Sequence, residues 1–221
     1  GLPMTMRTHT DPPARGASGA EPNRRFWHGG FPGLQVGDVL MSRTAQAQQQ
    51  RQKVVALPRP FDEVTLHDRV YFSDNQDFAR AYAYQLALTT PSGTIVSRGS
   101  LYEVEPVGAI EEDGAFTGCA VSWCSPSAVI TAVIDVDVRM RERDAVRVIG
   151  EYCTWDDGRP MYHPDGRLHL TRRMESVGIT QEQLDDMFRP WTRWTTAVER
   201  VGRAVAAGQL GGHAPRGARR G

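Results

Sequence analysis

The feature that most constrains the fold is the grouping of β-branched and aromatic residues into short runs, most of them bounded by glycine, proline or a Ser-Asp pair. Residues of these types favour strands, and glycine and proline interrupt strands. The runs that we expect to form strands are 25–30, 33–40 around a glycine turn, 69–74, 99–108, 128–138 and 145–155. Apolar residues recur at helical spacing at 75–88 and again after 179. Many strands with few helices between them predict an α+β domain and not a parallel doubly wound sheet.

The two ends of the chain contain little that could be buried. Residues 1–23 and 206–221 are rich in proline, glycine, alanine and charge, so we expect both to be disordered tails. Residues 24–205 are expected to form one globular domain. No apolar run reaches the length of a membrane helix and no signal-peptide pattern is visible, so we expect a cytoplasmic, monomeric protein without membrane association.

Charge and cysteine content exclude several classes of function. The chain has 26 basic and 26 acidic residues, so its net charge gives no general attraction to nucleic acid or membranes. The odd number of cysteines (Cys119, Cys124 and Cys153), without a C-x-x-C pair, predicts neither a disulfide framework nor a zinc site. His163 and His169 flank a Pro-Asp-Gly turn, which favours a hairpin over 159–174 because no third metal ligand lies nearby in the sequence. We therefore expect no metal.

Local signals place the remaining elements. The helix at 75–88 follows a strand, and Ser73 or Asp74 is expected to cap it. The polar stretch 42–64 is expected to be a long loop of the kind that often binds ligands. Near the end of the chain, Thr180 and Gln183 have the spacing of a capping box, and Pro190 is expected to divide the helical segment that follows.

Three polar residues stand at candidate functional positions. His28 ends a strand and is followed by Gly29 and Gly30, Tyr71 lies in the strand "VYFS", and Asp113 closes the acidic turn "EED". Taken singly, each has an ordinary structural interpretation: a strand-end histidine with its hydrogen bonds satisfied, a core aromatic residue and a solvated loop acid. Their order along the chain supplies the functional interpretation.

The phrases "FWHGG", "GLQVGDVL", "VYFSDNQDFARAYA", "RGSLYEVEPVGAIEEDGAF", "RERDAVRVIGEYCTW" and "ITQEQLDDM" occur in the order typical of one enzyme family. The chain resembles the ADP-ribosyltransferases of the histidine–tyrosine class, and most closely the rifampin ADP-ribosyltransferase family. The resemblance covers most of 25–190, with additional residues around 43–64, 114–140 and 156–175.

This resemblance implies a fold and a set of site residues. The family fold has two antiparallel sheets that flank a cleft for NAD⁺, with surrounding helices. His28 would hydrogen-bond the ribose of NAD⁺, Tyr71 would pack on the nicotinamide, and Asp113 would be the catalytic acidic residue. A register shift of one residue would give that role to Glu112 instead.

The resemblance extends to the contacts with the rest of the cofactor. Gly29 would let NAD⁺ approach the backbone, because a glycine has no Cβ. Arg98 matches an Arg-Gly at a strand entrance, and either contacts the phosphates or is a surface arginine.

The function implied is NAD⁺-dependent mono-ADP-ribosyl transfer with release of nicotinamide. Cleavage of the N-glycosidic bond builds positive charge on the ribose, which a nearby carboxylate stabilises. The acceptor would be a rifamycin-like small molecule, a protein or a nucleic acid, since the additional residues at 43–64 and 114–140 adjoin the site. The alternatives are an NAD⁺ glycohydrolase and a non-catalytic NAD⁺-binding module.

One competing motif is present. Glu103 and Glu105 spell the E-x-E of arginine-specific ADP-ribosyltransferases, but the Ser-Thr-Ser strand of that class is absent from the sequence. We therefore interpret this E-x-E as accidental.

Overall fold

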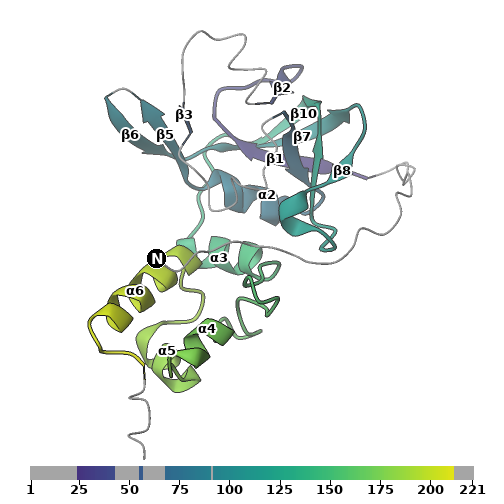
Figure 1. Cartoon of the computed structure of the whole chain (residues 1–221). Helices are drawn as coiled ribbons and strands as arrows, with labels where there is room; N and C mark the ends of the chain where they lie inside the picture. The colour runs from purple at the N-terminus through teal and green to yellow at the C-terminus, as the bar shows by residue number, and fades with distance from the viewer. Residues whose placement is uncertain (1–23, 43–54, 57–67, 91, 212–221) are drawn as a thin grey trace, which may run out of the picture. The chain divides into compact units, whose positions relative to one another are not determined.

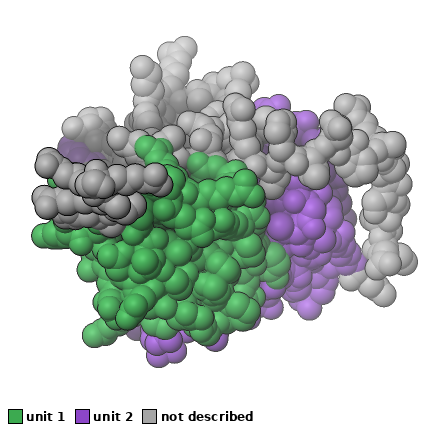
Figure 2. Space-filling model, turned by 60° about the horizontal axis from the view of Figure 1, so that its bottom comes forward, with its two compact units in different colours: residues 1–7, 150–221 green, residues 8–149 purple. Residues whose placement is uncertain are grey.

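The structure is a computed structural model that describes residues 24–42, 55–56, 68–90 and 92–211. The chain divides into two compact units, with the boundary between Ile149 and Gly150 (Figure 2). We call the described residues 24–149 the sheet unit and 150–211 the helical unit. The boundary falls inside the range 24–205 that the sequence assigns to one domain, and that assignment stays a prediction. The expected tail 1–23 and most of the expected loop 42–64 lie outside the described residues.

The sheet unit is built on antiparallel pairings (Figure 1). In the described residues a seven-stranded sheet has the order β2-β10-β7-β1-β4-β9-β8, and a three-stranded sheet has the order β3-β5-β6. The strands are β1 (Phe26–Gly30), β2 (Val39–Met41), β3 (Val55–Ala56), β4 (Val70–Ser73), β5 (Leu86–Thr90), β6 (Gly93–Ser97), β7 (Ser100–Val107), β8 (Glu111–Glu112), β9 (Ser122–Ser125) and β10 (Ser127–Asp135). The predicted α+β class is confirmed.

The helices of the sheet unit are α2 (Gln76–Ala83) and α3 (Glu142–Gly150), with a 3₁₀ turn η1 (Gly114–Phe116). The cap of α2 is Asn75, whose side chain accepts from the Phe78 N–H, so the expected caps Ser73 and Asp74 are wrong by one or two residues. The helix also ends before the predicted 88. The Gly99 N–H donates to the Ala83 carbonyl (2.7 Å), and the chain then enters β5, which pairs with β6. A non-local contact thus replaces the next helical turn.

The prediction of a strand at 145–155 is wrong, because residues 142–150 form α3. Ala145, Val146 and Ile149 are buried while Arg147 is exposed. These positions lie on one face of a helix. The segment is therefore helical, although its β-branched residues favour a strand.

The helical unit contains α4 (Arg172–Ser176), α5 (Gln181–Met187) and α6 (Trp194–Ala206). The predicted capping box is confirmed: the Gln183 N–H donates to Thr180 Oγ1 (3.2 Å) and the Thr180 N–H to Gln183 Oε1 (2.9 Å). Pro190 lies between α5 and α6, as predicted. The expected C-terminal tail from 206 begins with the last residue of α6, and 212–221 lie outside the described residues.

The hairpin predicted at 159–174 forms only around its turn. The His163 N–H donates to the Arg167 carbonyl (2.8 Å), and Tyr162 bridges to Leu168. The second arm then turns into α4 instead of continuing as a strand. The described residues contain no helix both long and apolar enough to cross a membrane.

Candidate functional site

The candidate site lies where β1 and β4 meet in the seven-stranded sheet. Strand β1 is in register with β7 along its whole length, whereas its register with β4 in the described residues is limited to Trp27 opposite Ser73. Beyond that pair, Nδ1 of His28 lies 2.7 Å from the Tyr71 carbonyl oxygen. The imidazole therefore links the two strands where their backbone pairing ends.

This hydrogen bond also determines the tautomer of His28. A carbonyl oxygen can only accept, so Nδ1 must carry the proton. In the neutral ring Nε2 is then the acceptor nitrogen. The backbone of Tyr71 thus holds the His28 ring in one orientation with a defined acceptor.

A cavity of about 220 Å³ opens at this junction, and His28, Gly29, Tyr71 and Asp113 all line it. The structure therefore brings together the predicted catalytic residues, which lie far apart in the sequence. The rest of the lining is mainly apolar and includes the aromatic residues Trp27, Phe31, Phe72, Phe78, Tyr82 and Phe116. Two of these rings, Phe78 and Phe116, pack edge to face with centroids 5.2 Å apart, which joins α2 to η1 on one wall.

Asp113 is the buried carboxyl group of this cavity, with 6% of its surface exposed. Its Oδ1 accepts from the Ala115 N–H (2.9 Å), which caps η1, and its Oδ2 accepts from the Ser122 hydroxyl (2.7 Å). Burial raises the pKa of Asp113 above its ordinary value, the two hydrogen bonds oppose that rise, and the charge of Glu112 adds to it. The arrangement gives a fixed carboxyl group that is costly to ionise.

Glu112, the alternative acidic residue, faces elsewhere. Its Oε1 accepts from the N–H groups of Gly118 (2.7 Å) and Ala120 (3.3 Å), and it does not belong to the cavity lining. Between the two candidates, the geometry favours Asp113.

The two glycines after His28 have packing reasons inside the protein. A Cβ on Gly29 would lie 2.1 Å from the Ala79 carbonyl oxygen, so glycine lets α2 pack directly on β1. A Cβ on Gly30 would lie 2.5 Å from Nε2 of His28, so glycine leaves space for the imidazole. Access of a cofactor to the backbone at Gly29, which also lines the cavity, stays a prediction.

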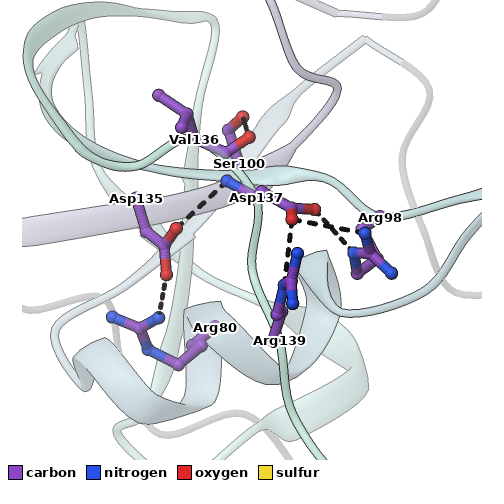
Figure 3. Close-up of polar contacts among 7 residues, drawn as sticks. All are labelled: Arg80, Arg98, Ser100, Asp135, Val136, Asp137 and Arg139. Carbon is purple, nitrogen blue, oxygen red and sulfur yellow. Dashed lines mark hydrogen bonds and ion pairs between the residues drawn. The ribbon is translucent and has the colours of Figure 1, made fainter.

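Arg98 is not brought to the cavity. Its Nε donates to Asp137 Oδ1 (2.6 Å) and its Nη2 to Asp137 Oδ2 (3.3 Å), and Arg139 pairs with the same carboxylate (Figure 3). In the same view Arg80 of α2 pairs with Asp135 at the end of β10. This cluster connects α2 and the β6–β7 connection to the end of β10 and the segment after it. It occupies the guanidinium of Arg98, for which a phosphate contact and a surface position were the two alternatives.

The residues of the E-x-E motif are not in the cavity lining either. Glu103 instead forms a two-point ion pair with Arg25, with Nε–Oε1 and Nη2–Oε2 distances of 2.7 and 2.6 Å. This pair joins the residue before β1 to β7.

Two polar lining residues were missed by the sequence analysis. Arg69 lies two residues before Tyr71, and the two-residue period of a strand could have placed both side chains on one face. Ser122 lies in a stretch that the family resemblance treats as additional. Its place beside Asp113 depends on the pairing of β9 with β8, which no local pattern indicates.

Metal binding has no visible basis in the described ranges, where no group of three His, Cys, Asp or Glu side chains is arranged to hold an ion. His163 and His169 instead stack on each other, with ring centroids 3.4 Å apart. A comparison with models of known protein families found no match, and neither did a comparison with curated proteins.

Proposed function

We propose that the protein is an NAD⁺-dependent mono-ADP-ribosyltransferase that transfers ADP-ribose to an acceptor and releases nicotinamide. The observation that carries the proposal is the meeting of His28, Tyr71 and Asp113 around one cavity of the sheet unit. These residues belong to three motifs that lie far apart in the sequence.

The chemistry of each group suits the reaction. The Nε2 acceptor of His28 can accept a hydrogen bond from a ribose hydroxyl, and so orients the sugar. The ring of Tyr71 can stack on nicotinamide, which contributes about 0.5–1.5 kcal/mol beyond burial. The ionised carboxylate of Asp113 can stabilise the positive charge that develops on the ribose when the N-glycosidic bond breaks.

The size of the cavity matches part of the substrate. Sites that bury a whole drug-sized ligand have volumes of about 300–1,000 Å³. The cavity of about 220 Å³, with its mainly apolar lining, is smaller than that. We assign it to the nicotinamide and its ribose, with the remainder of NAD⁺ extending beyond it.

The test is incubation with NAD⁺ labelled in its adenine half, in the presence of rifampicin, a cell lysate or nucleic acid. Transfer of label to one of these identifies the acceptor as a rifamycin-like molecule, a protein or a nucleic acid. Release of nicotinamide without transfer would identify a glycohydrolase, with water as the acceptor. NAD⁺ left intact in every mixture would contradict the proposal, and NAD⁺ binding without turnover would favour a non-catalytic module.

Substitutions connect the activity to this site. His28→Ala and Tyr71→Ala are expected to abolish NAD⁺ turnover without unfolding the sheet unit, whereas Tyr71→Phe keeps the ring and most of the activity. Turnover at the wild-type rate in both alanine variants would show that the activity lies elsewhere.

A further inference from the structure

Arg69 differs from the other arginines near the sheet in how weakly it is paired. It lines the cavity, and its Nε is buried without a hydrogen-bond partner among the described residues. The nearest carboxylate oxygens are Glu111 Oε2, 3.6 Å from Nε, and Asp68 Oδ2, 3.5 Å from Nη1. Both distances exceed the range of about 2.7–2.9 Å for a charge-assisted hydrogen bond.

Comparison with the paired arginines shows what Arg69 lacks. Arg25 and Arg98 each direct two nitrogens at one carboxylate, with shortest distances of 2.6 Å. Arg69 makes only loose contacts to two different acids, and the side chain of Glu111 is 54% exposed. Since exposed ion pairs contribute little, an oxyanion that accepts two hydrogen bonds could replace Glu111 at this guanidinium.

The surrounding charges set the condition for binding. The pKa of the Cys124 thiol is raised to about 11, mainly by burial; the charges of Asp113 and Glu111 contribute to this rise, and Arg69 opposes it. Arg69 is therefore a positively charged group in a region that also contains the carboxylates of Asp113 and Glu111. An anion must bind close to the guanidinium, on the side away from Asp113, to gain more from Arg69 than it loses to the acids.

We propose that Arg69 is the anion subsite of this cavity and binds the diphosphate of the dinucleotide. This proposal rests on the function proposed above. Arg69 directly precedes β4 and lies two residues before Tyr71, a separation of about 7 Å for extended backbone at about 3.3 Å per residue. In NAD⁺ a single ribose separates the nicotinamide from the diphosphate. A nicotinamide on Tyr71 thus places the diphosphate within reach of Arg69, whose planar fork matches two phosphate oxygens.

The test measures binding of inorganic pyrophosphate and of NAD⁺ by calorimetry to the full chain and to matched variants. Arg69→Gln is expected to weaken both ligands at least about tenfold, because a charged bidentate contact is lost. Arg98→Gln, the control, is expected to change neither. Glu111→Gln removes the competing carboxylate and is expected to tighten both about two- to fivefold. Nicotinamide riboside, which has no phosphate, is expected to bind wild type and Arg69→Gln equally.

The outcomes separate this proposal from the function on which it rests. Equal binding of pyrophosphate and NAD⁺ by wild type and Arg69→Gln overturns the subsite, even if labelled ADP-ribose is transferred. Arg69-dependent pyrophosphate binding without any NAD⁺ turnover would support the anion subsite and contradict the proposed enzymatic activity. If Arg69→Gln does not fold, Arg69→Lys keeps the charge without the fork, and unchanged affinity for pyrophosphate in that variant also overturns the proposal.

Discussion

At the scale of single residues, the site depends on side chains whose orientation is set by neighbours. The Tyr71 carbonyl orients His28, while the Ala115 N–H and the Ser122 hydroxyl hold the Asp113 carboxyl group. None of these neighbours is recognisable as part of a site from its residue type. They nevertheless decide which atoms of His28 and Asp113 can face a ligand.

The first prediction separates the charge of Asp113 from its structural role. In the variant Asp113→Asn the side-chain amide oxygen can still accept from the Ala115 N–H, so the cap of η1 is kept. We expect turnover to fall about 10²–10³-fold, as for loss of one transition-state contact, with little change in NAD⁺ affinity. Glu112→Gln, the matched control, should keep turnover. A larger loss of turnover in this control would assign the catalytic role to Glu112 instead of Asp113.

A second prediction concerns pH. Because the proposed reaction needs ionised Asp113 and burial raises the pKa of this group, turnover should rise with pH through a value above the ordinary aspartate range. Ser122→Ala removes a hydrogen bond that lowers the pKa of Asp113, so this rise should move to higher pH. Measured pH–rate profiles of the two proteins check the shift, and coincident profiles would contradict it.

The same raised pKa has an effect on stability. The contribution of Asp113 is fully present below its unfolded pKa and is lost as pH rises through its folded pKa. Asp113→Asn should therefore raise the free energy of unfolding more at neutral pH than in acid, relative to wild type. Denaturant unfolding at both pH values measures this difference. An equal change in the free energy of unfolding at both pH values would show that burial of the charge is not the cause.

At the scale of elements, the cavity wall depends on how closely α2 packs on β1. Ala79 and Ala83 belong to a buried cluster with Leu101 and Val138, and Gly29 lies against the backbone of the helix. Small residues on both elements make this approach possible. The wall that carries Phe78 and Tyr82 is therefore positioned by residues without functional groups.

Gly29→Ala tests this packing. The added Cβ would lie 2.1 Å from the Ala79 carbonyl oxygen, so the helix must shift, and we expect a loss of about 1–3 kcal/mol in the free energy of unfolding. Gly202→Ala in α6 is the control, since nothing lies within 4 Å of the added Cβ. It should stabilise by about 0.4–1 kcal/mol, because alanine favours a helix. Denaturant unfolding checks both signs.

The stacked histidines make the helical unit sensitive to acid. Burial lowers the pKa of His169, and the charges of His163, Arg159 and Arg167 lower it further, while Asp157 opposes them. A histidine whose folded pKa is depressed stabilises the fold above its unfolded pKa, and this stability is lost as pH falls through the folded pKa. We expect the denaturant concentration at the midpoint of unfolding to decrease as the pH is lowered below about 6.5. His169→Gln should reduce this dependence on pH. An unchanged dependence would show that the stacked histidines are not its cause.

At the scale of the whole molecule, all the described residues that line the cavity belong to the sheet unit. The seven-stranded sheet contributes β1 and β4, whose register in the described residues is limited to Trp27 opposite Ser73, and His28 and Tyr71 line the cavity on one side of this pair. The family resemblance implies two sheets around a cleft. That arrangement stays a prediction, because here the cavity lies at a junction inside one sheet.

How far the site could be predicted differs between its residues. Tyr71 and His28 were identifiable because the motifs that contain them occur in the order typical of the family that the chain resembles. Arg98 was a candidate because it matches an Arg-Gly of that family, and a sequence shows a charge without its partner. Only the fold shows that Asp137 pairs with Arg98 while Arg69 lines the cavity.

The sequence by itself determined the features that act over a few residues. These are the strand at Tyr71, the capping box at Thr180, the helix break at Pro190 and the turn at Gly166, which depend on backbone preferences and neighbouring side chains. Only the tertiary structure decided the end of α2, the helical state of 142–150, and the meeting of Asp113 with Ser122. Those outcomes depend on hydrogen bonds and burial between residues distant in the chain, and local patterns contain no information about such partners.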